Sequence, residues 1–253
     1  MSLAYVAIVV FGLAMGSFAS TIIHRLHTLE RGIFIGRSKC PKCATTLAAR
    51  DLVPLLSYLA NRFKCRFCKK PIALRYPLLE LSMGGTFLLT TLWVGLNDTA
   101  LLVFYLAMAF VFVLLAFYDL LFQEVPDSVV LPGIGVATLG VVLGDLHSLT
   151  SLLIGFAIPV VFFGALFLGS KGRWLGGGDV RIGALMGVLL GWPNIVIGLF
   201  LGYLLGAIYS LLGMAAKKFT RKTHIPFAPF LLTGTYITLF WGEKLLNWYL
   251  SFS

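Results

Sequence analysis

The chain has 253 residues, of which 59% are hydrophobic and 12% charged, and its formal net charge is +10. Soluble domains carry about 25% charged residues, so this composition excludes an ordinary soluble protein. The apolar residues come in runs of roughly 15 to 22 residues, which is the length that crosses the hydrocarbon core of a bilayer. The alternating pattern of a membrane β-barrel is missing. The sequence therefore predicts an all-α polytopic membrane protein.

We expect about eight transmembrane helices, with one small non-membrane segment between the first two. The first run has no basic residue before it and no small-residue cleavage site after it, so it is interpreted as a span and not as a removable signal. The division that follows is a first transmembrane helix at 1–23, a cysteine-containing segment at 24–76 and a seven-helix membrane domain at 77–253. The expected spans are 3–23, 77–96, 99–117, 128–144, 149–169, 179–192, 195–215 and 227–250.

The positions of the basic residues predict the orientation. With the N-terminus outside, the segments 24–76, 118–127, 170–181 and 216–226 fall on one side of the membrane, and they contain every Lys and Arg except Lys244. Such an excess marks the cytoplasmic side, so both termini are expected outside. We expect these bases to hold acidic lipid head groups, and we expect no nucleic-acid partner.

All four cysteines lie in the segment 24–76, in two Cys-x-x-Cys pairs: Cys40, Cys43, Cys65 and Cys68. Two such pairs separated by 21 residues are typical of a structural zinc site with four thiolates, as in zinc ribbons. The alternatives are redox chemistry and structural disulfides. A cytoplasmic location disfavours standing disulfides, because the thiols are kept reduced there.

Two aspartates are the candidate catalytic pair. Asp119 follows the third expected span and Asp179 begins the sixth, so both lie at cytoplasmic ends and can meet at one depth. Two adjacent carboxylates share one proton and can activate a water, which is aspartic-protease chemistry. Gly176, Gly177 and Gly178 are expected to let a substrate strand approach closely and to tolerate positive φ. The alternatives are a helix cap for Asp179 and a solvated interface carboxylate for Asp119.

Several motifs occur in a consistent order along nearly the whole chain, and together they resemble the bacterial type IV prepilin peptidases. Gly176-Gly177-Gly178-Asp179 is similar to the Gly-x-Gly-Asp motif that the family shares with archaeal preflagellin peptidases and presenilins. The other matching stretches are Gly16-Ser17-Phe18 with Arg25-Leu26, Asp51-Leu52-Val53-Pro54, Arg75-Tyr76-Pro77 with Glu80-Leu81, Asp119 with Val125-Pro126-Asp127, and Ile225-Pro226-Phe227.

The resemblance implies a membrane aspartic endopeptidase of the bacterial inner membrane that uses Asp119 and Asp179. It would remove the basic leader peptide of type IV prepilins or pseudopilins, for pilus assembly or type II secretion, on the cytoplasmic face. It also implies N-methylation of the new amino terminus from S-adenosyl-L-methionine through the segment 24–76. This chain has Phe63 where the family usually has glycine, and Ser20 where the family usually has asparagine.

The loop 118–127 contains Asp119, Glu124 and Asp127 and no basic residue. We expect Glu124 and Asp127 to attract the basic residues of a leader peptide. The alternative is that they are a helix end and its cap, and Asp127 also competes with Asp119 for the catalytic role.

Two other functions remain to be weighed. A secondary transporter with a half-helix ion site would use buried acids, but near the midplane and not at one face. A membrane thiol redox protein would need its cysteines on the oxidising side.

Overall fold

The computed structural model describes residues 2–28, 36–173, 175–220 and 223–251, and a helix occurs at each expected span. The described residues form no β-strand, only two isolated bridges. The helices are α1 (Ser2–Thr28), η1 (Ala49–Asp51), α2 (Leu56–Ala60), α3 (Arg75–Val94), α4 (Thr99–Phe122), α5 (Asp127–Leu143), α6 (Leu149–Ser170), α7 (Gly177–Leu190), α8 (Asn194–Ala215) and α9 (Ala228–Leu250).

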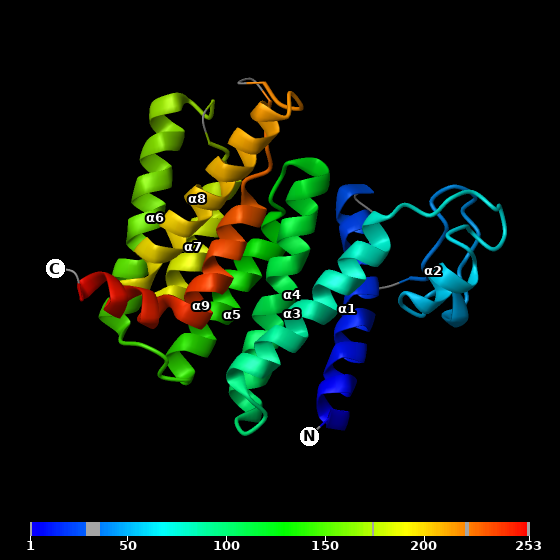
Figure 1. Cartoon of the computed structure of the whole chain (residues 1–253), viewed down its shortest axis with the longest axis horizontal. Helices are drawn as coiled ribbons and strands as arrows, with labels where there is room; N and C mark the ends of the chain where they lie inside the picture. The colour runs from blue at the N-terminus through cyan, green and yellow to red at the C-terminus, as the bar shows by residue number, and fades with distance from the viewer. Residues whose placement is uncertain (1, 29–35, 174, 221–222, 252–253) are drawn as a thin grey trace. The chain divides into compact units, whose positions relative to one another are not determined.

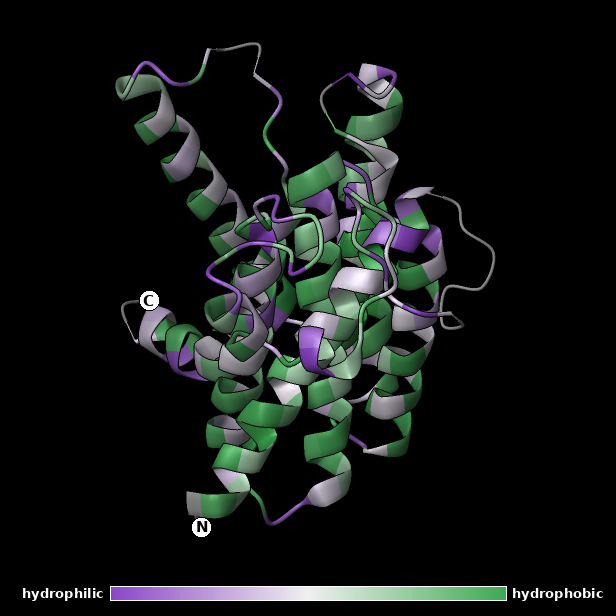
Figure 2. Cartoon of the chain, turned by 90° about the vertical axis from the view of Figure 1, so that its right-hand side faces the viewer, coloured by the Kyte–Doolittle hydropathy of each residue, from purple (hydrophilic) through white to green (hydrophobic). Residues whose placement is uncertain are grey.

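The protein is a multi-pass membrane protein. Within the described ranges, five helices are long and apolar enough to cross a bilayer, namely α1, α3, α4, α6 and α8. The helix α5 is apolar but shorter. Hydrophobic residues cover the long helices, and hydrophilic residues concentrate in the segments that connect them (Figure 2). The expected number of eight spans stays a prediction.

The chain forms two compact units, unit 1 (Met1–Leu114) and unit 2 (Leu115–Ser253). In unit 1, α1 and α3 lie side by side (Figure 1). They approach so closely that a Cβ atom on Gly16 would lie 2.6 Å from the Cα atom of Glu80. Small residues allow such backbone contact between membrane helices, and here the contact positions Glu80 beside the first helix. The domain boundaries expected from the sequence stay predictions.

Unit 2 is built around α7, which packs against α5, α6, α8 and α9 (Figure 1). All residues from Ile182 to Leu190 are buried. A helix that is apolar on every side belongs inside a bundle, which explains how a helix of only 14 residues fits among longer ones. At the crossing with α6, a Cβ atom on Gly155 would lie 2.5 Å from the carbonyl oxygen of Gly187, so the two backbones are in direct contact.

Candidate active site and metal centre

Asp119 lies in the last turns of α4, which continues to Phe122, beyond the expected end of the span at 117. The side chain is buried, with 6% of the residue exposed. Its Oδ2 atom accepts a hydrogen bond of 2.9 Å from the backbone N–H of Ala228, the first residue of α9. The side-chain amide of Gln123 donates to the carbonyl oxygen of His224 at 3.1 Å. The end of α4 is therefore tied to the segment that leads into α9.

Asp179 is the third residue of α7. Its Oδ2 atom accepts a hydrogen bond of 3.1 Å from the backbone N–H of Gly176, which precedes the helix. This bond satisfies one of the donors that a helix N-terminus leaves without a partner. The side chain of Asp179 therefore does cap the helix, from its third position, and the same bond fixes the direction of the carboxylate.

The two aspartates interact. Both belong to unit 2, and the charge of Asp119 acts on the carboxylate of Asp179. The charge of Asp179 also acts on the hydroxyl group of Tyr203, which comes from α8. The sequence did not indicate a role for Tyr203, because a tyrosine within an apolar run is usually a core residue. The arrangement brings two acids and a phenol together, which are the groups needed to move protons on water and on a carbonyl oxygen.

The glycines before Asp179 differ from the expectation in one respect. Gly176 has a φ of −78°, and Gly177 and Gly178 form the first turn of α7. None of the three has a positive φ, so that part of the expectation is wrong. Gly178 is instead required by a close approach, because a Cβ atom there would lie 2.5 Å from the Cγ2 atom of Val125. The missing side chain allows the α4–α5 loop to pack on α7.

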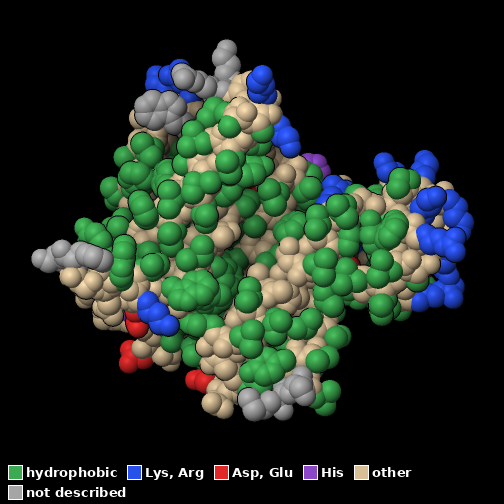
Figure 3. Space-filling view, viewed as in Figure 1, with side chains coloured by type: hydrophobic (Ala, Val, Ile, Leu, Met, Phe, Trp, Pro, Cys, Tyr) green, Lys and Arg blue, Asp and Glu red, His purple; other side chains and the backbone are tan. Residues whose placement is uncertain are grey.

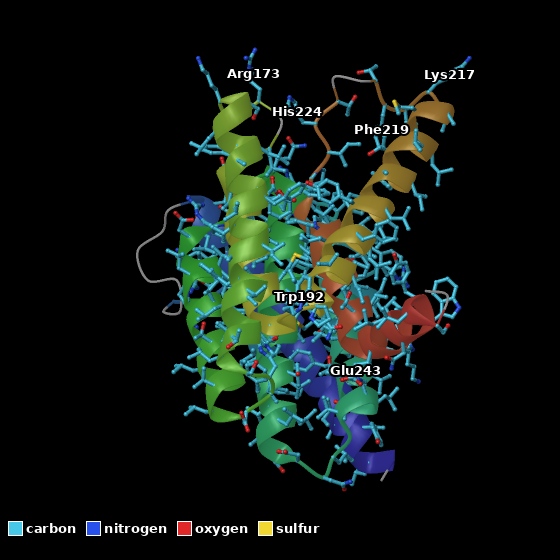
Figure 4. All side chains as sticks on the ribbon, turned by 90° about the vertical axis from the view of Figure 1, so that its left-hand side faces the viewer. Arg173, Trp192, Lys217, Phe219, His224 and Glu243 are labelled. Carbon is cyan, nitrogen blue, oxygen red and sulfur yellow. The ribbon has the colours of Figure 1, made fainter. Side chains whose placement is uncertain are left out.

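The other acids of this loop have different surroundings. Glu124 is exposed. Asp127 is the first residue of α5 and forms an ion pair with Arg181 of α7, so its charge is compensated. Asp119 is buried, whereas the side chain of Asp127 is 55% exposed. Arg173, Lys217 and His224 project from the same end of unit 2, and Glu243 lies toward the other end (Figure 4).

The four cysteines of unit 1 form a cluster. The Sγ atoms of Cys40, Cys43, Cys65 and Cys68 all lie within 4.8 Å of one another. A tetrahedral zinc ion with Zn–S bonds of about 2.3 Å holds its sulfurs about 3.8 Å apart. The cluster therefore has the spacing that a four-thiolate metal site needs, and it could hold a metal ion.

Both halves of the cluster use the same turn. The backbone N–H of Cys40 donates to the carbonyl oxygen of Thr45 at 3.0 Å, and that of Cys65 donates to Lys70 at 2.9 Å. The residue before each acceptor has a positive φ, 56° and 58° respectively. The two turns thus present their sulfurs in equivalent ways, as expected for a pair of metal knuckles.

The thiols of the cluster differ in acidity. Hydrogen bonds from Thr45 lower the pKa of Cys43 to about 6, whereas burial raises the pKa of Cys40 to about 11. A bound metal deprotonates a coordinating thiol outright, so it would remove this difference. Lys and Arg side chains gather over this part of unit 1 (Figure 3), and they would offset the negative charge of four thiolates.

Phe63 lies in the cysteine-containing segment and has a φ of 65°. This left-handed conformation favours glycine, so phenylalanine is strained there. Its ring packs against Tyr58, with the centroids 4.9 Å apart. The family pattern has glycine at this position, and the backbone conformation would suit glycine. In this chain phenylalanine occupies the position and contacts Tyr58 instead.

Comparisons with known proteins match both units. Residues 10–94 match the family model of the bacterial peptidase A24 N-terminal domain, and residues 105–211 match the type IV leader peptidase family. No solved structure shows a significant match.

Similar curated proteins include three that carry the name prepilin leader peptidase/N-methyltransferase. That of Aeromonas hydrophila is 31% identical over 95% of this chain and 92% of its own length. That of Legionella pneumophila is 28% identical over 98% and 95%, respectively. That of Bacillus subtilis (strain 168) is 28% identical over 95% and 96%. The similarity therefore covers both units and nearly the full length of these proteins.

Proposed function

The chain belongs to the type IV leader peptidase family, and from this premise we propose that it removes the leader peptide of type IV prepilins or pseudopilins and then methylates the new amino terminus. The observation that carries the peptidase assignment is the interaction of Asp119 with Asp179 in unit 2. Both residues lie in the part of the chain that matches the leader peptidase family.

The proposed mechanism is that of an aspartic endopeptidase. One carboxylate of the pair is ionised and takes a proton from a water, which attacks the scissile carbonyl. The other carboxyl group is protonated and donates to the carbonyl oxygen. The proton taken from the water then passes to the leaving amine nitrogen as the C–N bond of the tetrahedral intermediate breaks. The mechanism requires the two carboxyl groups to hold one proton between them, as paired carboxylates do. The backbone N–H groups of Ala228 and Gly176 hold the two carboxylates in fixed directions during these steps.

The leader peptide would be bound through its positive charge. Glu124 is exposed in the α4–α5 loop, which brings it near the proposed site through the packing of Val125 on Gly178. Asp127 adds a second acid, whose charge is shared with Arg181. In this role Gly176 and Gly177 leave the backbone before Asp179 accessible to the substrate chain, whereas Gly178 packs against Val125.

Unit 1 would carry the metal and the methyl donor. We assign zinc to the four cysteines, and we assign it a structural role, because four thiolates leave no open position for water. The methyl group comes from S-adenosylmethionine, which suits the N-methyltransferase part of the relatives' name.

The proposed location is the bacterial inner membrane, with both termini outside and the acids at the cytoplasmic face. The basic connecting segments support this orientation, as does the grouping of Arg173, Lys217 and His224 at one end of unit 2 (Figure 4). The transporter and thiol redox alternatives gain no support from the matched families. The acids also lie near helix ends, not at helix midpoints, which disfavours an ion site at the midplane.

The test is a cleavage assay with a purified prepilin in detergent, comparing Asp119→Asn and Asp179→Asn with the wild type. We expect each variant to lose at least about 100-fold in kcat, which is the contribution of a positioned acid or base. The exposed loop residue Asp145 gives a matched control, and Asp145→Asn should cleave normally. If either catalytic variant kept activity within tenfold of the wild type while its metal content stayed normal, the aspartic mechanism would be wrong.

A further inference from the structure

Unit 1 contains a cavity of about 460 Å³ that the peptidase chemistry does not use. It is lined by residues of α1, of the cysteine-containing segment and of the start of α3. Cys40 and Cys65 belong to its wall, so the metal cluster forms part of it. Sites for small molecules and cofactors have volumes of about 300 to 1,000 Å³, so this cavity has room for a nucleoside-sized ligand.

The cavity holds a buried carboxylate, that of Glu80, of which 9% is exposed. Its Oε2 atom accepts a hydrogen bond of 2.9 Å from the backbone N–H of Leu55. The other acid of the wall, Asp51, forms an ion pair of 3.2 Å with Arg66. In the described part of the chain, Glu80 has no such ion pair. A buried carboxyl group without an ion pair suits a ligand that brings a positive charge, because buried charges are usually paired.

The rest of the wall indicates what else the ligand carries. Tyr58 and Tyr76 supply aromatic faces, on which a purine base can stack. Arg37 and Lys64 are exposed at the wall and suit a carboxylate group of the ligand. A ligand that combines a purine, a cationic centre and a carboxylate matches all three features, and S-adenosylmethionine has this combination.

We propose that this cavity is the site that binds S-adenosylmethionine, with the Glu80 carboxylate compensating the positive charge of the sulfonium group. The inference rests on the proposed methyltransferase function and assigns that function to particular residues. It also accounts for the position of the cysteine cluster, which forms part of one wall of the site. The close contact of Gly16 with the Cα atom of Glu80 fixes the backbone from which this carboxylate projects.

Glu80 has a structural role as well, which the test must separate from ligand binding. Leu55 has a φ of 57°, and its N–H bond to Glu80 holds this strained turn. The substitution Glu80→Gln removes the charge but keeps an oxygen that can accept the same bond. A matched control is Asp98→Asn, because Asp98 is an acid of unit 1 that does not line the cavity and accepts a bond from Leu101 N–H.

The experiment measures the affinity of the full chain in detergent for S-adenosylmethionine and for S-adenosylhomocysteine, by calorimetry. The second ligand has a neutral thioether where the first has a sulfonium. We expect Glu80→Gln to weaken binding of S-adenosylmethionine at least tenfold and binding of S-adenosylhomocysteine threefold or less. Asp98→Asn should leave both affinities unchanged. Metal content and prepilin cleavage should stay normal in both variants, which shows that the two units are folded.

Two outcomes would overturn the site. One is an affinity of Glu80→Gln for S-adenosylmethionine within twofold of the wild type, and the other is an equal loss for both ligands. Ultraviolet crosslinking of labelled S-adenosylmethionine to the wild type gives a second measurement that needs no variant. Label in peptides from residues 17–80 supports the site, and label confined to residues 115–253 contradicts it. If the wild type bound no S-adenosylmethionine at all, the proposed methyltransferase function would fail together with the site.

Discussion

The carboxylate of Asp119 is held by the backbone N–H of Ala228, a residue 109 positions further along the chain. Ala228 is the first residue of α9, so the bond comes from a helix N-terminus, where free N–H groups and the helix dipole favour a negative charge. The partner of the pair, Asp179, stands in the first turn of α7. Each acid of the proposed site is therefore oriented by the start of a helix. The direction of each carboxylate does not depend on contacts with long, flexible side chains.

Tyr203 is expected to assist the aspartates through its hydroxyl group, on which the charge of Asp179 acts. The substitution Tyr203→Phe should lower kcat about tenfold and change KM little, because a donor that acts on the transition state affects the chemical step. The ring contacts of Tyr203 with Phe163 and Phe227 are kept by phenylalanine, so folding should not change. A rise in KM with an unchanged kcat would instead place Tyr203 in substrate binding.

Gly178 is expected to tolerate no side chain. In Gly178→Ala, the new Cβ atom would meet Val125 and push the α4–α5 loop away from α7, so we expect prepilin cleavage to fall at least tenfold. The second substitution Val125→Ala removes the nearest methyl group and should restore part of the activity in the double variant. Cleavage rates of the two single variants and the double variant measure this coupling. Additive losses would show that the loop contact is not the cause.

Glu124 is expected to select basic leaders. The substitution Glu124→Lys reverses an exposed charge in the α4–α5 loop, so cleavage of a basic-leader prepilin should fall more than cleavage of a neutral-leader version. The difference should shrink at high salt, because exposed charges are screened. The measurement is the ratio of kcat/KM for the two substrates at low and high ionic strength. An unchanged ratio would contradict the proposed role of the loop.

Metal removal is expected to separate the two activities. A chelator, or the substitution Cys43→Ser, should abolish N-methylation, because the cluster forms a wall of the cavity in unit 1. Cleavage should persist at a reduced or normal rate, because Asp119 and Asp179 belong to unit 2. Mass spectrometry of the processed prepilin would reveal a cleaved but unmethylated amino terminus. Loss of cleavage in step with loss of metal would show that unit 2 depends on the cluster.

The helices could be predicted from the sequence because hydropathy and length are local properties. The structure has a helix at every expected position, although α4 continues five residues past its expected end at 117. That extension places Asp119 inside a helix and not in a loop. The cluster of four cysteines was also predictable, because the spacing of two Cys-x-x-Cys pairs reflects the geometry of a single ion.

The features that the sequence did not indicate arise from contacts between distant segments. Glu80 belongs to a stretch that matches the family pattern, but only the packing of α1 on α3 shows that it lines a cavity. Tyr203 likewise becomes a candidate site residue only through its electrostatic interaction with Asp179, which lies on another helix. Gly178 was expected to allow close approach of a substrate strand and positive φ, whereas the segment that approaches it is Val125 of the α4–α5 loop. No local pattern encodes which helix faces fit together.

The small size of α7 has a consequence for the surrounding lipid. At about 1.5 Å per residue, its 14 residues span about 21 Å, whereas the 22 residues of the adjacent α6 span about 33 Å. A bilayer interior is about 30 Å thick, so in the predicted eight-span topology at least one end of α7 stops below the head groups. In that topology water has to pass through the protein to reach that end, and the acyl chain length of the lipid sets how far it has to pass.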